Sequence, residues 1–192
     1  MVNEPENPGR HDSGPSAVSR PPVNADRARA LAETLHHGQL DASGAPLIDH
    51  IRRVAAAVPG EARVVAWLHE ALERTSISEE ELLSTGLSHD ELRAIRLLTR
   101  DTNSRSNTRY LAHVKRIARA GGAGAHVARC VKRADLADRA LNRPTPSDGW
   151  SPPHELGLEL LQRAATRAPS LHASETRMQT TMRSQQPTTE RG

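Results

Sequence analysis

The sequence predicts an all-α domain, a bundle of about seven to eight helices with disordered tails at both ends. Only 2% of the 192 residues are aromatic and none is Phe. A core built from Leu, Val, Ile and Ala favours packed helices over an aromatic-rich β-sandwich. Apolar residues recur at helical spacing through the middle of the chain, and residues typical of helix ends separate these runs. No segment requires a strand.

The first three expected helices each have a recognisable start or stop. Asn24 can cap a helix that runs from residue 25 to about residue 37. Pro46 suits the first turn of a helix over residues 47–58, which Pro59 and Gly60 then end. A third helix is expected over residues 61–74, with its apolar residues on one side.

Two capping boxes follow. Ser78 with Glu81 predicts a short helix that ends by Gly86, and Ser88 with Glu91 predicts another that runs to about residue 100. Three further helices are expected over residues 108–120, 125–141 and 154–167. The predicted domain therefore spans residues 24–168.

The remaining residues, 1–23 and 169–192, are rich in Pro, Gly, Ser, Thr and charge and are predicted to be disordered. The single cysteine, Cys130, excludes a disulfide framework and is expected to be an inert core thiol. No apolar run approaches the length of a membrane span, and the N-terminus does not resemble a signal peptide. We expect a cytoplasmic protein with no membrane partner.

Charge is unevenly distributed along the chain. Residues 26–91 contain 6 basic and 12 acidic residues, whereas residues 93–143 contain 13 basic and 3 acidic residues. Such a chain can fold an acidic, metal-attracting half against a basic, phosphate-attracting half. Arginine-rich helices that merely solvate one face give the same counts, so charge alone leaves both interpretations open.

Four metal-capable side chains lie within apolar helical runs: His50, His69, Glu70 and Asp135. A shared divalent cation is one way to satisfy such groups if they are buried together. The alternative for His69 and Glu70 is an exposed polar pair at the edge of a helix. A zincin His-Glu-x-x-His motif is excluded, because its second histidine would stand where the chain has Glu73.

Three blocks carry a family resemblance: "HHGQLDASGAPLIDHIRRVAAAV", "VVAWLHEALERTSISEEELLSTGLSHDELRAIRLLTR" and "RCVKRADLADRAL". Their order and spacing, over more than half of the chain, resemble the HD superfamily of metal-dependent phosphohydrolases. The likeness is narrower to the RelA/SpoT hydrolase domains and their small stand-alone relatives, and it implies an HD-domain-like bundle.

The resemblance also implies roles for single residues. His50, His69, Glu70 and Asp135 would be the ligands of a divalent ion, expected to be Mn²⁺, and Glu73 would be the catalytic residue that orients or deprotonates water. His37 would support the site. Asp138 is expected to lie at its edge or to pair with an arginine. The other histidines are expected at the surface: His36, His89, His113, His126, His154 and His172.

The chain departs from the family pattern at five positions. Glu70 replaces the signature aspartate, and Arg74 replaces an acid, so the charge beside the expected ion is reversed. Arg139 replaces an asparagine, Asp41 an arginine, and Ile51 a proline. Most of these changes touch the expected chemistry or the nucleotide pocket, so the substrate does not follow from the resemblance.

Two functions of different classes remain after this comparison. The first is an HD-type phosphohydrolase acting on a nucleotide or a related phosphate ester, with (p)ppGpp-like compounds among the candidates. The second is a catalytically inactive HD-fold module that binds a nucleotide or a protein partner, because the Arg74 guanidinium can replace a cation electrostatically. Nucleic-acid binding is disfavoured, since the chain has almost no aromatic side chains on which bases could stack. The oligomeric state does not follow from the sequence.

Overall fold

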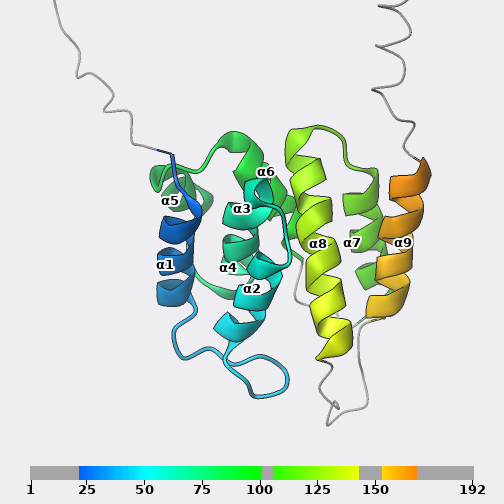
Figure 1. Ribbon diagram of the computed structural model, residues 1–192, viewed down its shortest axis with the longest axis horizontal. Coiled ribbons are helices and arrows are strands. Elements are labelled where there is room, and N and C mark those ends of the chain that lie inside the picture. The colour runs from blue at the N-terminus through cyan, green and yellow to red at the C-terminus, as the bar shows by residue number, and fades with distance from the viewer. Residues whose placement is uncertain (1–21, 101–105, 143–152, 168–192) are drawn as a thin grey trace, which may run out of the picture.

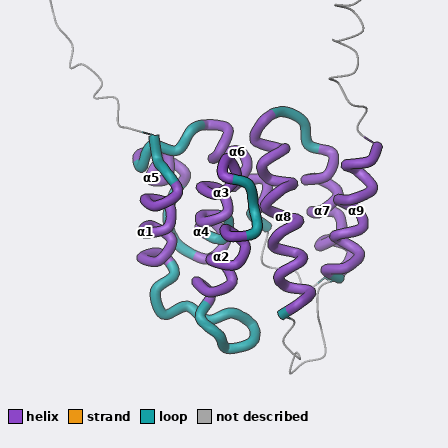
Figure 2. The backbone as a smooth tube through the Cα atoms, in the orientation of Figure 1, coloured by secondary structure: helices purple, strands orange, loops and turns teal. Residues whose placement is uncertain are grey.

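The computed structural model describes residues 22–100, 106–142 and 153–167, and within them the regular elements are helices. The predicted all-α fold is confirmed (Figure 2). The elements are α1 (Ala25–Leu35), α2 (Leu47–Ala56), the 3₁₀ helix η1 (Gly60–Ala62), α3 (Arg63–Leu68), α4 (Ala71–Arg74), α5 (Glu79–Ser84), α6 (His89–Leu98), α7 (Asn107–Arg119), α8 (Ala123–Leu141) and α9 (His154–Arg167). Most of both predicted tails lies outside the described residues.

Helix α8 is the longest element and lies in the middle of the bundle (Figure 1). It packs against α2 and α6 on one side and against α7 and α9 on the other, while α1 covers α3. The core between these helices consists mainly of Ala, Val, Leu and Ile. Candidate residues on α2, on the α3–α4 segment and on α8 therefore meet inside one core.

The helix starts follow the sequence closely. Both predicted capping boxes are confirmed, with reciprocal hydrogen bonds between Ser78 and Glu81 and between Ser88 and Glu91. Asn24 caps α1 through the backbone N–H of Arg27. Val23, which the prediction assigned to the disordered segment, is buried, and its N–H donates to the carbonyl of Gly86. No described helix is both long and apolar enough to cross a membrane.

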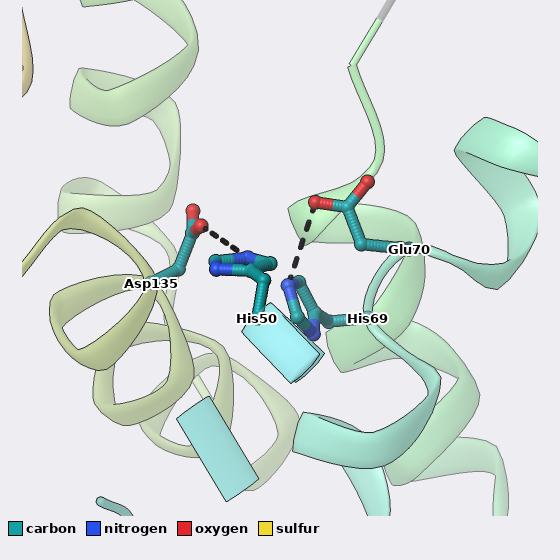
Figure 3. A group of neighbouring side chains, drawn as sticks. All are labelled: His50, His69, Glu70 and Asp135. Carbon is teal, nitrogen blue, oxygen red and sulfur yellow. Dashed lines mark ion pairs between the residues drawn. The ribbon is translucent and has the colours of Figure 1, made fainter. Parts of the chain in front are cut away.

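The predicted third helix is interrupted in the structure. It divides into η1, α3 and α4, and the break between α3 and α4 falls at His69 and Glu70. In a continuous helix, neighbouring residues point about 100° apart. The helix is interrupted at His69 and Glu70, and the side chains of both residues face the candidate site (Figure 3).

A glycine sets the close approach of α6 and α8. A Cβ atom built on Gly124, in the first turn of α8, would lie 2.5 Å from the backbone oxygen of Asp90 in α6. A larger residue cannot be accommodated there without moving backbone. The contact fixes α8, which carries Asp135, against the rest of the core.

Candidate metal centre

The structure brings four predicted site residues together. His50 comes from α2, His69 and Glu70 from the break between α3 and α4, and Asp135 from α8 (Figure 3). Each offers one ligand atom, and these atoms all lie within 4.8 Å of one another. All four residues are buried, none more than 5% exposed. The interpretation of His69 and Glu70 as an exposed polar pair is therefore wrong.

Hydrogen bonds orient both imidazole rings of the cluster. His69 Nδ1 donates to the backbone oxygen of Ala66 at 2.7 Å, and His50 Nδ1 donates to Asp138 Oδ2 at 2.7 Å. A donor at Nδ1 leaves the lone pair of a neutral ring on Nε2. Both Nε2 atoms are buried, and among the described residues neither makes a hydrogen bond; each lies beside a carboxylate oxygen, His50 Nε2 3.3 Å from Asp135 and His69 Nε2 3.5 Å from Glu70. A buried nitrogen without a partner is unfavourable unless something else binds it.

A divalent cation fits this donor set. Imidazole nitrogens and carboxylate oxygens are ligands for Zn²⁺, Mn²⁺ and Fe²⁺. Ligand bonds of roughly 2.0–2.6 Å allow donors on opposite sides of one ion to lie about 4–5 Å apart. The spacing of up to 4.8 Å between the four ligand atoms is compatible with that limit. The two buried Nε2 atoms each lie beside a carboxylate oxygen without a hydrogen bond to it, an arrangement that supports a metal ion independently of any family resemblance.

Cationic side chains surround the two carboxylates. Arg139 donates from Nη2 to Glu70 at 2.5 Å and from Nε to Asp135 at 2.6 Å. Lys132 donates to the second oxygen of Asp135 at 2.7 Å, and Arg74 donates to the second oxygen of Glu70 at 3.2 Å. Every carboxylate oxygen of the cluster therefore has a cationic partner.

These contacts keep both acids ionised. Burial alone would raise the pKa of Glu70, but Arg139 and His69 outweigh it and hold that pKa well below the usual range. Burial likewise opposes ionisation of Asp135, and Lys132 with Arg139 holds its pKa well below the usual range. The cluster therefore presents two charged carboxylates beside the two imidazoles.

Glu73 lies outside the four-residue cluster and is held by Arg100. Its Oε2 accepts the backbone N–H of Arg100 at 3.0 Å, and its Oε1 accepts the guanidinium of Arg100 at 2.8 Å. Arg100 stands at the end of the segment that follows α6, so the pairing joins α4 to a distant part of the chain. No sequence pattern predicts this contact.

Two expectations about histidines need correction. His36, expected at the surface, is 1% exposed, whereas His37, expected to support the site, is exposed. His36 Nδ1 donates to Gln39, and its Nε2 is buried without a partner among the described residues. Burial lowers the pKa of His36. The charge of Glu70 opposes this shift, and that of His69 adds to it. Four-residue steps from Ala28 through Ala32 lead to His36, a helical signal that could have identified it.

The structure also describes four of the other histidines expected at the surface. His154 is buried, and Tyr110 contacts its Nδ1 at 2.9 Å, because α9 packs over α7. His89 and His126 are exposed as expected. His113 is half-buried with its Nε2 enclosed. His172 lies outside the described residues.

Asp138 performs both of the roles that the sequence left open. It accepts a hydrogen bond from His50, and it also binds the guanidinium of Arg53 through both oxygens, at 2.6 and 3.0 Å.

Two other residues named in the sequence analysis lie outside the cluster. Asp41 accepts hydrogen bonds from the backbone N–H groups of Ser43 and Ala45 within its own loop. Cys130 is half-buried and packs against the core.

Comparison with known proteins supports the fold assignment. No family model matches the sequence, and no curated protein matches it significantly. A solved structure described as a metazoan orthologue of SpoT that hydrolyses ppGpp is similar, with a TM-score of 0.58 and 21% sequence identity. The similarity covers 76% of this chain and 86% of that chain. The similarity shows that the two proteins share a fold, which is all-helical in the described residues of this chain.

Proposed function

We propose that this protein is a metal-dependent phosphohydrolase of the HD type that acts on a nucleotide or a related phosphate ester. The observation that carries the proposal is the pair of buried Nε2 atoms of His50 and His69, which face the ionised Glu70 and Asp135. Mn²⁺ is the proposed ion. The ppGpp hydrolysis of the structural neighbour makes (p)ppGpp-like compounds the first substrates to test.

Each residue of the candidate site has a proposed role in this reaction. His50, His69, Glu70 and Asp135 would hold the cation, which when bound would supply Lewis-acid stabilisation of phosphate charge and lower the pKa of water. Asp138 and the Ala66 carbonyl keep the histidines oriented. Glu73 is the proposed acid–base residue.

The cations around the cluster suit a phosphorylated ligand. The side chains of Arg74, Arg100 and Arg139 are between 27% and 35% exposed, so each can reach solvent and an incoming anion. Guanidinium groups bind phosphate oxygens in a bidentate manner, which positions the phosphate as well as neutralising it.

Metal content is the first test. Purified protein should bind about one equivalent of Mn²⁺ per chain by elemental analysis and calorimetry, and His69→Ala should abolish binding because it removes a ligand. His89→Ala, on the exposed first turn of α6, is the matched control and should bind like the wild type. Absence of metal binding by the wild-type protein would contradict the proposal.

Substrate class is tested next. Phosphate or pyrophosphate release should be measured with added Mn²⁺ over ppGpp, GTP, GDP and simple phosphate esters. Metal-dependent turnover of one of these, lost in His69→Ala, supports the hydrolase.

The second candidate is an inactive HD-fold module that binds a phosphorylated ligand. Arg139, Lys132 and Arg74 already neutralise the two carboxylates, as they would in a site that has replaced its ion by guanidinium groups. Nucleotide binding without turnover would favour this candidate. Gain of Mn²⁺-dependent hydrolysis in the double variant Glu70→Asp with Arg74→Asp would identify a lapsed enzyme.

A further inference from the structure

The Arg139 guanidinium bridges two acids that come from different parts of the fold. Arg139 lies one helical turn after Asp135 on α8, and its Nε donates to Asp135 Oδ1 at 2.6 Å. Its Nη2 donates to Glu70 Oε1 at 2.5 Å, a contact between residues 69 positions apart. One guanidinium thus joins α8 to the break between α3 and α4.

The bridged oxygens are also the ones nearest the histidines. Asp135 Oδ1 lies 3.3 Å from His50 Nε2, and Glu70 Oε1 lies 3.5 Å from His69 Nε2. A cation bound by both imidazoles and both carboxylates would draw on these oxygens. Arg139 therefore contacts the two carboxylate oxygens that such a cation would bind.

The other carboxylate oxygens do not offer a free alternative. Asp135 Oδ2 is bound by Lys132, and Glu70 Oε2 is bound by Arg74. A divalent ion added to this arrangement would meet three positive side chains, and unscreened like charges in a buried site repel strongly. The repulsion opposes entry of the ion, and it falls when a cationic side chain moves away from the carboxylates.

Exposure indicates that Arg139 leaves more readily than Lys132. The Arg139 side chain is 27% exposed, so its guanidinium has a route to solvent, whereas the Lys132 side chain is only 7% exposed. Lys132 Nζ also lies 5.9 Å from the centroid of the Tyr110 ring, which can stabilise the ammonium in place. Arg74 is also partly exposed, but it contacts only one of the two acids.

We propose that Arg139 is an internal counter-cation that competes with a divalent metal ion for Glu70 and Asp135. The inference rests on the proposed function in one respect, that the cluster binds a metal ion. The guanidinium and the ion exclude each other from the two bridged oxygens. Arg139 thereby sets the metal affinity of the site without being a ligand.

Calorimetric titration with Mn²⁺ tests the competition. Arg139→Gln should bind Mn²⁺ at least tenfold more tightly than the wild type, because the ion no longer displaces a guanidinium. Arg163→Gln is the matched control, since Arg163 also pairs with an acid four residues away on its helix, Glu159, but at an exposed position. Its affinity should equal that of the wild type.

The outcomes separate this inference from the proposed function. Equal, measurable affinities in the wild type and Arg139→Gln would overturn the competition and leave the metal site intact. Binding by Arg139→Gln alone would support the competition in its strongest form. Absence of binding in every variant would overturn both proposals.

A second measurement guards against a folding defect. Arg139→Gln leaves buried carboxylates with fewer partners, so it should unfold at a lower temperature than the wild type in EDTA. Added Mn²⁺ should raise its melting temperature more than that of the wild type, which a purely structural role does not predict. If Arg139→Gln fails to fold, Arg139→Lys carries the test, because an ammonium lacks the planar fork that bridges two acids. Arg139→Lys should bind Mn²⁺ severalfold more tightly than the wild type, and equal affinity would overturn the proposal.

Discussion

Asp138 Oδ2 accepts a hydrogen bond from His50 Nδ1 at 2.7 Å, although the two residues lie 88 positions apart in the chain. The bond fixes the ring orientation and turns Nε2 toward the acids of the cluster, 3.3 Å from Asp135 Oδ1. The same carboxylate is held by Arg53, which limits its movement. The candidate metal site therefore depends on residues that would not themselves touch the ion.

Asp138→Asn tests this support. An amide binds the imidazole N–H more weakly than a carboxylate does, and it can turn its NH₂ group toward the ring. Loss of such a partner typically lowers metal affinity by about 10–100-fold, which is the expected fall in Mn²⁺ affinity by calorimetry. Asp49→Asn is the control, because Asp49 is only partly buried, lies on the same helix as His50 and pairs with Arg52. An unchanged affinity in Asp138→Asn would contradict the role given to this bond.

Glu73→Gln separates catalysis from metal binding. If Glu73 handles a proton in the reaction, the amide should reduce kcat by about 100-fold or more. Mn²⁺ affinity should change little, because Glu73 is held by Arg100 outside the four-residue cluster. Steady-state phosphate release and calorimetry measure the two effects. A parallel loss of affinity would assign Glu73 to metal binding instead. Glu159→Gln, at an exposed position on α9, controls for the loss of a charge.

Gly124→Ala should destabilise the fold through the α6–α8 contact. The added Cβ would meet the Asp90 backbone oxygen at 2.5 Å, and helix backbone cannot yield without separating the helices. Overpacking of this kind lowers the free energy of unfolding by about 1–3 kcal/mol. Gly121→Ala is the control, since its Cβ would meet nothing within 4 Å. Urea denaturation measures both, and equal stability of the two variants would contradict the close contact.

His113 should make stability depend on pH. Burial, with the charges of Lys132 and Arg116, lowers the pKa of His113 to about 3. Unfolded histidine has a pKa of about 6.5, so below that pH the unfolded chain takes up a proton that the folded chain does not. The contribution of His113 to the free energy of unfolding is fully present above pH 6.5. It is lost as pH falls from about 6.5 toward 3, by up to about 1.4 kcal/mol per pH unit.

The comparison of variants isolates this effect. His113→Gln should lose less stability than the wild type between pH 7.5 and pH 5 in urea denaturation, whereas His89→Gln, at an exposed position, should follow the wild type. Identical pH profiles for His113→Gln and the wild type would show that His113 is protonated as easily in the folded chain as in the unfolded one.

Much of the fold follows from local sequence signals. Asn24, Ser78 and Ser88 begin helices where the sequence predicts them, because a side-chain oxygen within reach of unpaired backbone N–H groups acts over only a few residues. The scarcity of aromatic residues correctly predicted a core of small aliphatic side chains. The break at His69 and Glu70 was not predicted, since helical periodicity continues through it.

By itself, the sequence determined the helices, their caps and the residues that meet at the candidate site. Only the tertiary structure decided how those residues are paired: Arg139 across Glu70 and Asp135, Arg100 on Glu73, and Asp138 behind His50. The tertiary structure also buried His36 rather than His37. Helix propensity and capping act between near neighbours, whereas the charge and exposure of a buried ionisable group depend on side chains that packing brings from distant helices.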